Sequence, residues 1–156
     1  MKKIILISTL TLVVDILTKQ LVINSLIEHQ SITIIKDFFS ITYAKNTGVA
    51  FSFLEGNVPL IIILTSIIIS LIFNYLKTTN PNKYEIICYG LLLGGSIGNL
   101  IDRIIYGYVI DFLDFNLFGY PYPIFNVADI AIVVSIFTII ILSLIESRNK
   151  NEVNSR

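Results

Sequence analysis

The sequence predicts an all-α integral membrane protein with four transmembrane helices and a small extracellular β-element between the first two. The chain of 156 residues is 54% hydrophobic and 14% charged, with a mean hydropathy of +0.81, which is too apolar for a soluble domain. Four apolar runs each approach the roughly 20 residues that a helix needs to cross hydrocarbon. We therefore expect one membrane-embedded domain with spans near residues 4–23, 58–76, 86–101 and 124–145.

The first run, residues 4–23, follows the basic start MKK and could belong to a cleavable signal peptide. It continues through Asp15 and Lys19 without a small-residue cleavage site, so we predict a retained span. Asp15 and Lys19 are four residues apart and share one helix face. We expect them to form an ion pair.

The segment from 24 to 57 is too long for a simple turn and contains SITIIK and FFSITYA. Both stretches are rich in β-branched and aromatic residues, which predicts the β-element. In the following KNTGVAFSF, Asn46 and Gly48 supply turn chemistry, while Ala50 and Ser52 keep the backbone approachable. Taken alone, this motif indicates only a turn.

The third run carries a stripe of small residues, because glycine recurs at every fourth position at Gly90, Gly94 and Gly98. Such a stripe lets another helix approach closely, so we interpret it as a packing surface.

Polar residues follow directly at the end of the third run. Asn99, Asp102 and Arg103 occupy positions i, i+3 and i+4 and can form one polar face near the outer boundary. We interpret Asp102 and Arg103 as a structural clasp and not as a catalytic pair.

Two further acids lie around the start of the fourth run. Asp111 belongs to the aromatic loop YVIDFLDF, and Asn126 and Asp129 share a helix face in FNVAD. If the helix starts near Ile124, Asp129 lies roughly 7 Å below its outer end. Acids that enter lipid are costly, so a functional role is the default hypothesis for both.

The distribution of basic residues predicts the orientation. The side that holds Lys36 and Lys45 has few cations, so we expect it to be the outer face of the bacterial cytoplasmic membrane, with the longer loops and the acids near it. Both termini are then cytoplasmic, and residues 147–156 form a frayed, polar cytoplasmic tail. The opposite side carries Lys2, Lys3, Lys77, Lys83, Arg148, Lys150 and Arg156.

Several function classes are disfavoured. The formal net charge is zero and basic residues do not interleave with aromatic ones, so nucleic acid is not an expected partner. A lone His29 and a lone Cys88 in an apolar span argue against a zinc site, a disulfide framework and a thiol nucleophile.

Carboxylate chemistry remains. Two aspartates within hydrogen-bonding range hold one proton between them, because a second negative charge would be penalised. The ionised acid can then take a proton from water while the protonated acid donates to a carbonyl oxygen, as in aspartic peptide hydrolysis. Such a pair titrates as a unit.

Five sequence blocks, DILTK, NTGVAFS, GGSIGNLIDR, YVIDF and FNVAD, resemble the bacterial lipoprotein signal peptidase family, also called signal peptidase II. They occur in the family's order from Asp15 to Asp129, and Asp114 is an additional acid near the fourth block. By motif position the resemblance implies a catalytic dyad of Asp111 and Asp129. It also implies that a second set of residues supports or lines the site: Asn46, Gly48, Asn99, Asp102, Arg103, Asn126, Asp15 and Lys19.

The resemblance implies an aspartic endopeptidase that removes signal peptides from prolipoproteins once their cysteine carries diacylglycerol. It implies four transmembrane helices with an extracellular β-cradle on the membrane, contact with membrane lipid, and inhibition by the cyclic peptide globomycin. It implies neither a metal nor an organic cofactor. A further hypothesis is that the substrate's signal helix lies against the glycine stripe.

Two alternatives stay open on the residues alone. A small proton-coupled transporter would use the same acids as a relay, although relay acids are expected near the bilayer midplane. Asp102, Gly107, Asp111 and Asp114 also faintly resemble the magnesium-binding acids of membrane phosphoalcohol transferases, which would require a cytoplasmic site.

Overall fold

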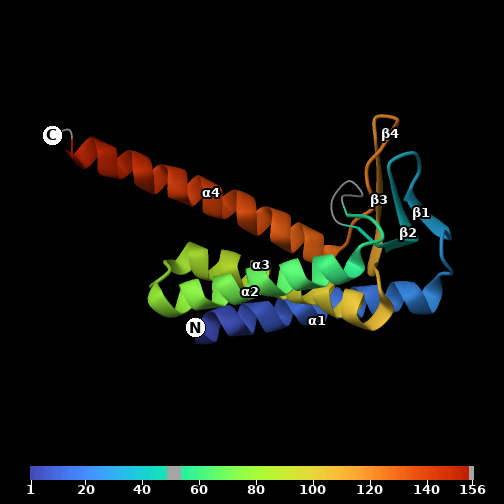
Figure 1. The fold of residues 1–156 in the computed structure, drawn as a ribbon. Helices are drawn as coiled ribbons and strands as arrows, with labels where there is room; N and C mark the ends of the chain where they lie inside the picture. Colours follow the sequence, from blue (N-terminus) through green and yellow to red (C-terminus); the bar gives the residue numbers. More distant parts are fainter. Residues whose placement is uncertain (49–53, 155–156) are drawn as a thin grey trace.

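The structure is a computed structural model and describes residues 1–48 and 54–154 (Figure 1). Within these residues, four helices are long and apolar enough to cross a membrane, and four strands form one small antiparallel sheet. Ala50 and Ser52 of the predicted turn lie outside the described residues. The elements follow in the order α1 (Lys2–Ser25), β1 (Ser31–Ile35), β2 (Phe39–Asn46), α2 (Val58–Thr78), α3 (Lys83–Tyr106), β3 (Val109–Leu117), β4 (Tyr120–Pro121) and α4 (Val127–Asn154).

The fourth helix differs from its prediction at both ends. It begins at Val127 and not near Ile124, because Asn126 caps it, so Asp129 lies in the first turn and the predicted depth of 7 Å is wrong. It also continues to Asn154, where a frayed tail was expected. Residues 147–154 contain no Gly or Pro and include the helix formers Arg, Lys and Glu, which explains the extension.

The glycine stripe on α3 accommodates α1. A Cβ atom at Gly94 would stand 2.6 Å from the carbonyl oxygen of Ser8, and one at Gly90 would stand 2.6 Å from Cβ of Ile7. The backbones therefore approach so closely that only glycine fits. This confirms a packing role, and it shows that the hypothesis of a signal helix on the stripe is wrong, because α1 already covers it.

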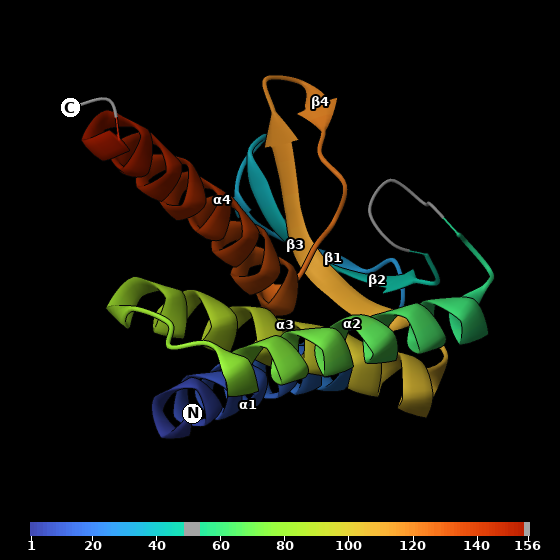
Figure 2. The same ribbon diagram turned by 60° about the vertical axis from the view of Figure 1, so that its left-hand side comes forward.

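A neighbouring face of α3 receives the start of α4. A Cβ atom at Gly95 would stand 2.6 Å from the carbonyl oxygen of Ala128. Farther along, α4 diverges from the other three helices (Figure 2). The close contact between α3 and α4 is thus made beside the end of α4 that carries Asp129.

The sheet has the strand order β1-β2-β3-β4, and only its first half lies where the sequence predicted it. The aromatic segment expected to be a loop forms β3 and β4 instead. Ala44 of β2 pairs with Asp111 of β3, and an irregularity follows between Ile41 and Ala44. The predicted β-element between the first two helices is therefore part of a larger sheet, to which the α3–α4 connection contributes half of the strands.

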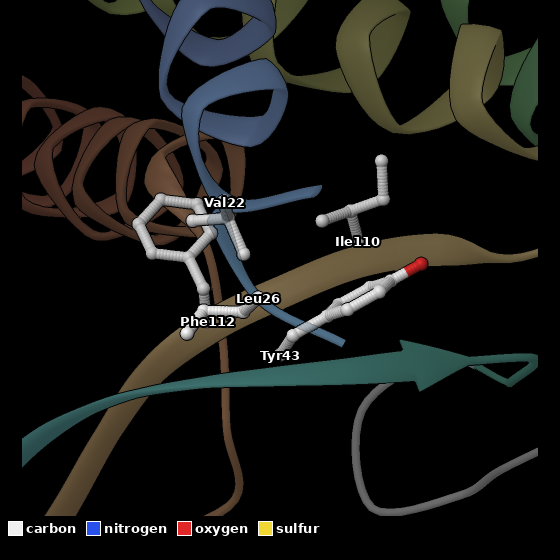
Figure 3. Packing of buried hydrophobic residues seen from close by; sticks show 5 residues of the cluster. All are labelled: Val22, Leu26, Tyr43, Ile110 and Phe112. Atoms are coloured by element: carbon white, nitrogen blue, oxygen red, sulfur yellow. The ribbon is translucent and has the colours of Figure 1, made fainter. Parts of the chain in front are cut away.

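A small apolar cluster fastens this sheet to the helices (Figure 3). It joins the C-terminal end of α1 to β2 and β3. Strand β3 follows α3 closely, because Gly107 ends the helix in a left-handed conformation (φ 79°). The buried side chains are Val22, Leu26, Tyr43, Ile110 and Phe112. Because Ile110 and Phe112 flank Asp111, this packing fixes the strand that carries the first acid.

Candidate active site

Asp111 and Asp129 are brought together by the chain that returns from the hairpin. Phe125 bonds back to β3, with its carbonyl oxygen 2.8 Å from the Leu113 nitrogen. The next residue, Asn126, donates from Nδ2 to Oδ1 of Asp111 at 2.7 Å and from its backbone nitrogen to Oδ2 of Asp129 at 3.1 Å. One buried residue therefore contacts both carboxylates.

The same asparagine is the N-cap of α4. Its Oδ1 accepts a hydrogen bond from the Asp129 backbone nitrogen at 2.9 Å, while the Asp129 carboxylate accepts from the Asn126 backbone nitrogen. The side chain of each residue therefore satisfies the backbone N–H of the other. The cap occupies the amide oxygen of Asn126. Only the amide nitrogen is left to face Asp111, so the helix cap determines which donor the acid receives.

Two other asparagines are oriented in the same way. Oδ1 of Asn46 accepts from the Gly48 nitrogen at 2.9 Å, and its Nδ2 donates to Oδ2 of Asp111 at 2.8 Å. Oδ1 of Asn99 accepts from Lys19 at 2.9 Å, and its Nδ2 donates to Oδ1 of Asp129 at 2.7 Å. Each carboxylate thus receives two N–H donors.

Lys19 is the centre of a buried charge network. The side chain is 1% exposed, and its Nζ lies 2.8 Å from Asp15 and 2.9 Å from Asp102, which confirms the predicted Asp15–Lys19 pair. Asp15 also accepts from the Ala128 nitrogen at 3.0 Å, and Asp102 accepts from the Ile110 nitrogen at 3.2 Å. The network therefore ties α1 and α3 to the residues next to both Asp111 and Asp129.

Arg103 and Asp102 hold different segments, although the sequence suggested a single clasp. Nη2 of Arg103 donates to the Gly48 carbonyl at 2.6 Å, and Nη1 donates to the Asn99 carbonyl at 3.3 Å. Gly48 is thereby fixed at both its carbonyl and its N–H, the latter through Asn46. Arg103 positions the turn that supplies one donor to Asp111.

The local electrostatics favour a proton on Asp111. Burial and, to a smaller extent, the charge of nearby Asp129 together raise the pKa of Asp111 to about 7, against the hydrogen bonds from Asn46 and Asn126, which lower it. Buried carboxylates outnumber buried cations in this region, where Asp15, Asp102 and Asp111 lie near Lys19 and Arg103. One retained proton therefore lowers the energy of the whole cluster.

The remaining polar candidates stand apart. Asp114, also on β3, accepts a hydrogen bond from the Thr42 hydroxyl at 2.6 Å. Cys88 is buried in α3, and the His29 side chain is 83% exposed. Among the described residues, no group of three or more His, Cys, Asp or Glu side chains is arranged to hold a metal ion.

Sequence reasoning missed two backbone donors, the N–H groups of Ile110 and Ala128, which are bound by Asp102 and Asp15. It also missed the capping role of Asn126, although the spacing from Asn126 to Asp129 is that of a reciprocal cap at a helix start. The capping signal was present in the sequence. The two backbone donors had no signal, because their partners lie on other elements.

Comparison with known proteins confirms the family resemblance. The sequence model of the family described as signal peptidase (SPase) II matches residues 7–145. The lipoprotein signal peptidases of Staphylococcus aureus strains JH9 and Newman are each 37% identical over 149 residues, which cover 95% of this chain and 91% of theirs.

Two solved structures, each described as a bacterial membrane enzyme, share the fold. The first, at 2.3 Å resolution, has a TM-score of 0.89 and 34% identity, with 96% of this chain and 92% of that one covered. The second, at 1.9 Å resolution, has a TM-score of 0.83 and 34% identity, with 92% and 94% covered. The chain therefore belongs to the signal peptidase II family.

Proposed function

We propose that this protein is an intramembrane aspartic endopeptidase that removes signal peptides from diacylglyceryl-modified prolipoproteins. Family membership supports the peptidase activity and the class of substrate. The observation that carries the mechanism is the link from Asn126 to both Asp111 and Asp129. Two acids held by one residue at the end of a membrane span can share a proton and act together.

In the proposed reaction, the ionised acid takes a proton from water, and the water oxygen forms a bond to the scissile carbonyl carbon. The protonated acid gives its proton to the carbonyl oxygen. The tetrahedral intermediate then collapses: the acid that took the water proton gives it to the departing amine as the C–N bond breaks, and the other acid regains its proton from a hydroxyl group of the intermediate. Asn46, Asn99 and Asn126 keep the four carboxylate oxygens oriented throughout.

The position of the acids fits a substrate that stays in the bilayer. Asp129 lies in the first turn of an apolar helix, so a signal helix and its lipid-modified cysteine need not leave the membrane to reach it. We further propose that both termini are cytoplasmic, that the sheet lies on the outer face, and that globomycin binds at the dyad. A proton-relay transporter remains the alternative, although its acids are expected near the bilayer midplane.

The proposal is tested with purified protein and two synthetic precursor peptides that differ only in diacylglycerol on the cysteine. We expect cleavage of the lipidated peptide before that cysteine, at a rate at least tenfold above that of the unmodified peptide. Added globomycin should suppress the reaction. If neither peptide is cut while protein in liposomes carries a proton flux, the transporter alternative would replace the peptidase.

The shared proton predicts the dependence of cleavage on pH. Because the pKa of Asp111 is raised to about 7, the pair keeps its proton below this value and loses it above. We expect kcat/KM to fall about tenfold per pH unit on the alkaline side of pH 7. Asn46→Ala removes a hydrogen bond that lowers this pKa, so the alkaline limb should move to higher pH.

Thr42→Ala is the matched control, because Thr42 lies on the same strand but donates to Asp114. Its alkaline limb should coincide with that of the parent protein. Equal pH profiles for Asn46→Ala and the parent protein would contradict the assignment of the limb to Asp111.

A further inference from the structure

We propose that Lys19 is a positioning residue of the reaction, which acts through Asn99 to make Asp129 the base of the dyad. Asp111 then keeps the proton and acts as the acid. The inference rests on the proposed function, because it gives each carboxyl group of that site a separate role. It also gives Lys19 a part in the chemistry beyond its two ion pairs.

A chain of hydrogen bonds leads from the Lys19 ammonium to Asp129. Lys19 donates from Nζ to Oδ1 of Asn99 at 2.9 Å, and Nδ2 of Asn99 donates to Oδ1 of Asp129 at 2.7 Å. Nδ2 of Asn126 donates to the same Asn99 oxygen at 3.2 Å. Hydrogen bonds in a chain polarise one another, so a cation and a second donor on the amide oxygen strengthen the N–H that faces Asp129.

The amides that donate to Asp111 are not polarised by a cation in this way. Oδ1 of Asn46 accepts from the backbone nitrogen of Gly48. Oδ1 of Asn126 accepts from the backbone nitrogen of Asp129. Both of these donors are neutral. The two acids therefore receive hydrogen bonds of unequal strength, although the side-chain donors are asparagines in each case.

The surroundings of the two acids differ in the same sense. Asp111 is 2% exposed on β3, whereas Asp129 is only partly buried. Asp129 also lies in the first turn of α4, where the helix dipole favours a negative charge. The acid that ionises is therefore the more exposed one, which a water molecule can reach.

The other charged groups beside the dyad are held by different contacts. Asp15 of α1 and Asp102 of α3 each form an ion pair with Lys19. Arg103 of α3 donates to the backbone carbonyls of Asn99 and Gly48. Lys19 is therefore kept in place by its ion pairs even when the Asn99 side chain is removed, which allows the connection to Asp129 to be tested by itself.

Asn99→Leu breaks this connection and leaves both ion pairs of Lys19. The Asp129 carboxylate then loses a hydrogen bond that favours its ionised form. We expect the acid limb of kcat/KM for the lipidated peptide to move upward by about one pH unit, which is roughly the effect of one hydrogen bond to a charged group. The alkaline limb, which Asn46→Ala moves, should stay in place.

Lys19→Met should move the acid limb in the same direction, because it removes the cation that polarises Asn99. In the Asn99→Leu background the same substitution should move the limb less than half as far, because the connection to Asp129 is already broken. A Lys19→Met protein that does not fold is replaced by one that also carries Asp102→Asn, which removes one of the two carboxylates that lose their ion-pair partner.

Gln20→Leu is the matched control. Gln20 joins the same two helices, α1 and α3, by donating to the Tyr106 hydroxyl at 3.1 Å, and this contact is exposed. Neither limb of the pH profile should move in this variant. Thermal melting verifies that every variant is folded.

A second measurement needs no turnover, so it separates a failure of this inference from a failure of the proposed function. The infrared C=O band of a protonated carboxyl group is followed against pH in Asp111→Asn and in Asp129→Asn, each relative to the variant that carries both substitutions. We expect the band to disappear at lower pH in Asp111→Asn, where Asp129 is the remaining acid. If this order holds while no peptide is cut, the proton is placed correctly and the proposed function is wrong.

Three results would overturn the inference. The first is the reverse order of the two infrared bands, which would make Asp111 the base. The second is an acid limb that stays in place in folded Asn99→Leu. The third is an acid limb that moves equally far on Lys19→Met with and without Asn99, which would show that Lys19 acts without the amide.

Discussion

Replacement of either Asp111 or Asp129 with Asn is expected to lower kcat/KM for the lipidated precursor by roughly 10³-fold or more. The variant loses either the acid that activates water or the acid that protonates the carbonyl oxygen. The geometry adds a second effect. Both oxygens of Asp111 accept N–H groups, from Asn126 and Asn46, so the amide nitrogen of an Asn there would face a donor.

Asp114→Asn is the matched control, because Asp114 lies three residues farther along the same strand and accepts a hydrogen bond from Thr42. Its kcat/KM should stay within a few-fold of the parent value. Thermal melting separates a catalytic loss from misfolding. Cleavage retained in a folded Asp111→Asn or Asp129→Asn variant would exclude the dyad mechanism.

The largest effect on stability is expected from Lys19→Met. The Lys19 ammonium contacts Asp15, Asp102 and Asn99 while 1% exposed, so its removal takes the ion-pair partner away from two buried carboxylates. Loss of one partner of a buried ion pair costs about 3–5 kcal/mol of the free energy of unfolding. Denaturant titration in detergent measures this loss.

Lys45→Met is the corresponding surface control. Lys45 pairs with Glu28 at 2.8 Å, but its side chain is 35% exposed, so the cost should stay below about 1 kcal/mol. Equal destabilisation by the two substitutions would show that the buried network does not stabilise the fold.

The sequence predicted what depends on local pattern. Hydropathy located the four long apolar helices, the first two to within two residues at each end, and the spacing of Asp15 and Lys19 was sufficient to predict their pairing. The glycine stripe indicated close packing, but its partner depends on how the helices associate. Nothing in the spacing of Gly94 identifies α1 as the helix that fills it.

The β3 segment shows where local pattern is insufficient. VIDFLDFNL suits a strand, but its placement depends on β2, more than sixty residues earlier in the chain, with which Asp111 pairs through Ala44. The start of α4 was predicted too early, because the apolar residues Ile124 and Phe125 lie before the cap at Asn126 and lengthen the hydrophobic run at its N-terminal end. In the candidate site, the two acids were predicted from the family's blocks, whereas the orientation of the asparagines follows only from contacts between elements.

The way α4 is attached has a mechanical consequence. Its first turn is held by Asp15 through Ala128 and by the close approach to Gly95, and Ala131 and Ser135 in the next turns are buried, while its far end diverges from the other helices (Figure 2). A rod fastened at one end pivots there, so a swing of α4 displaces its distant half most and Asp129 least.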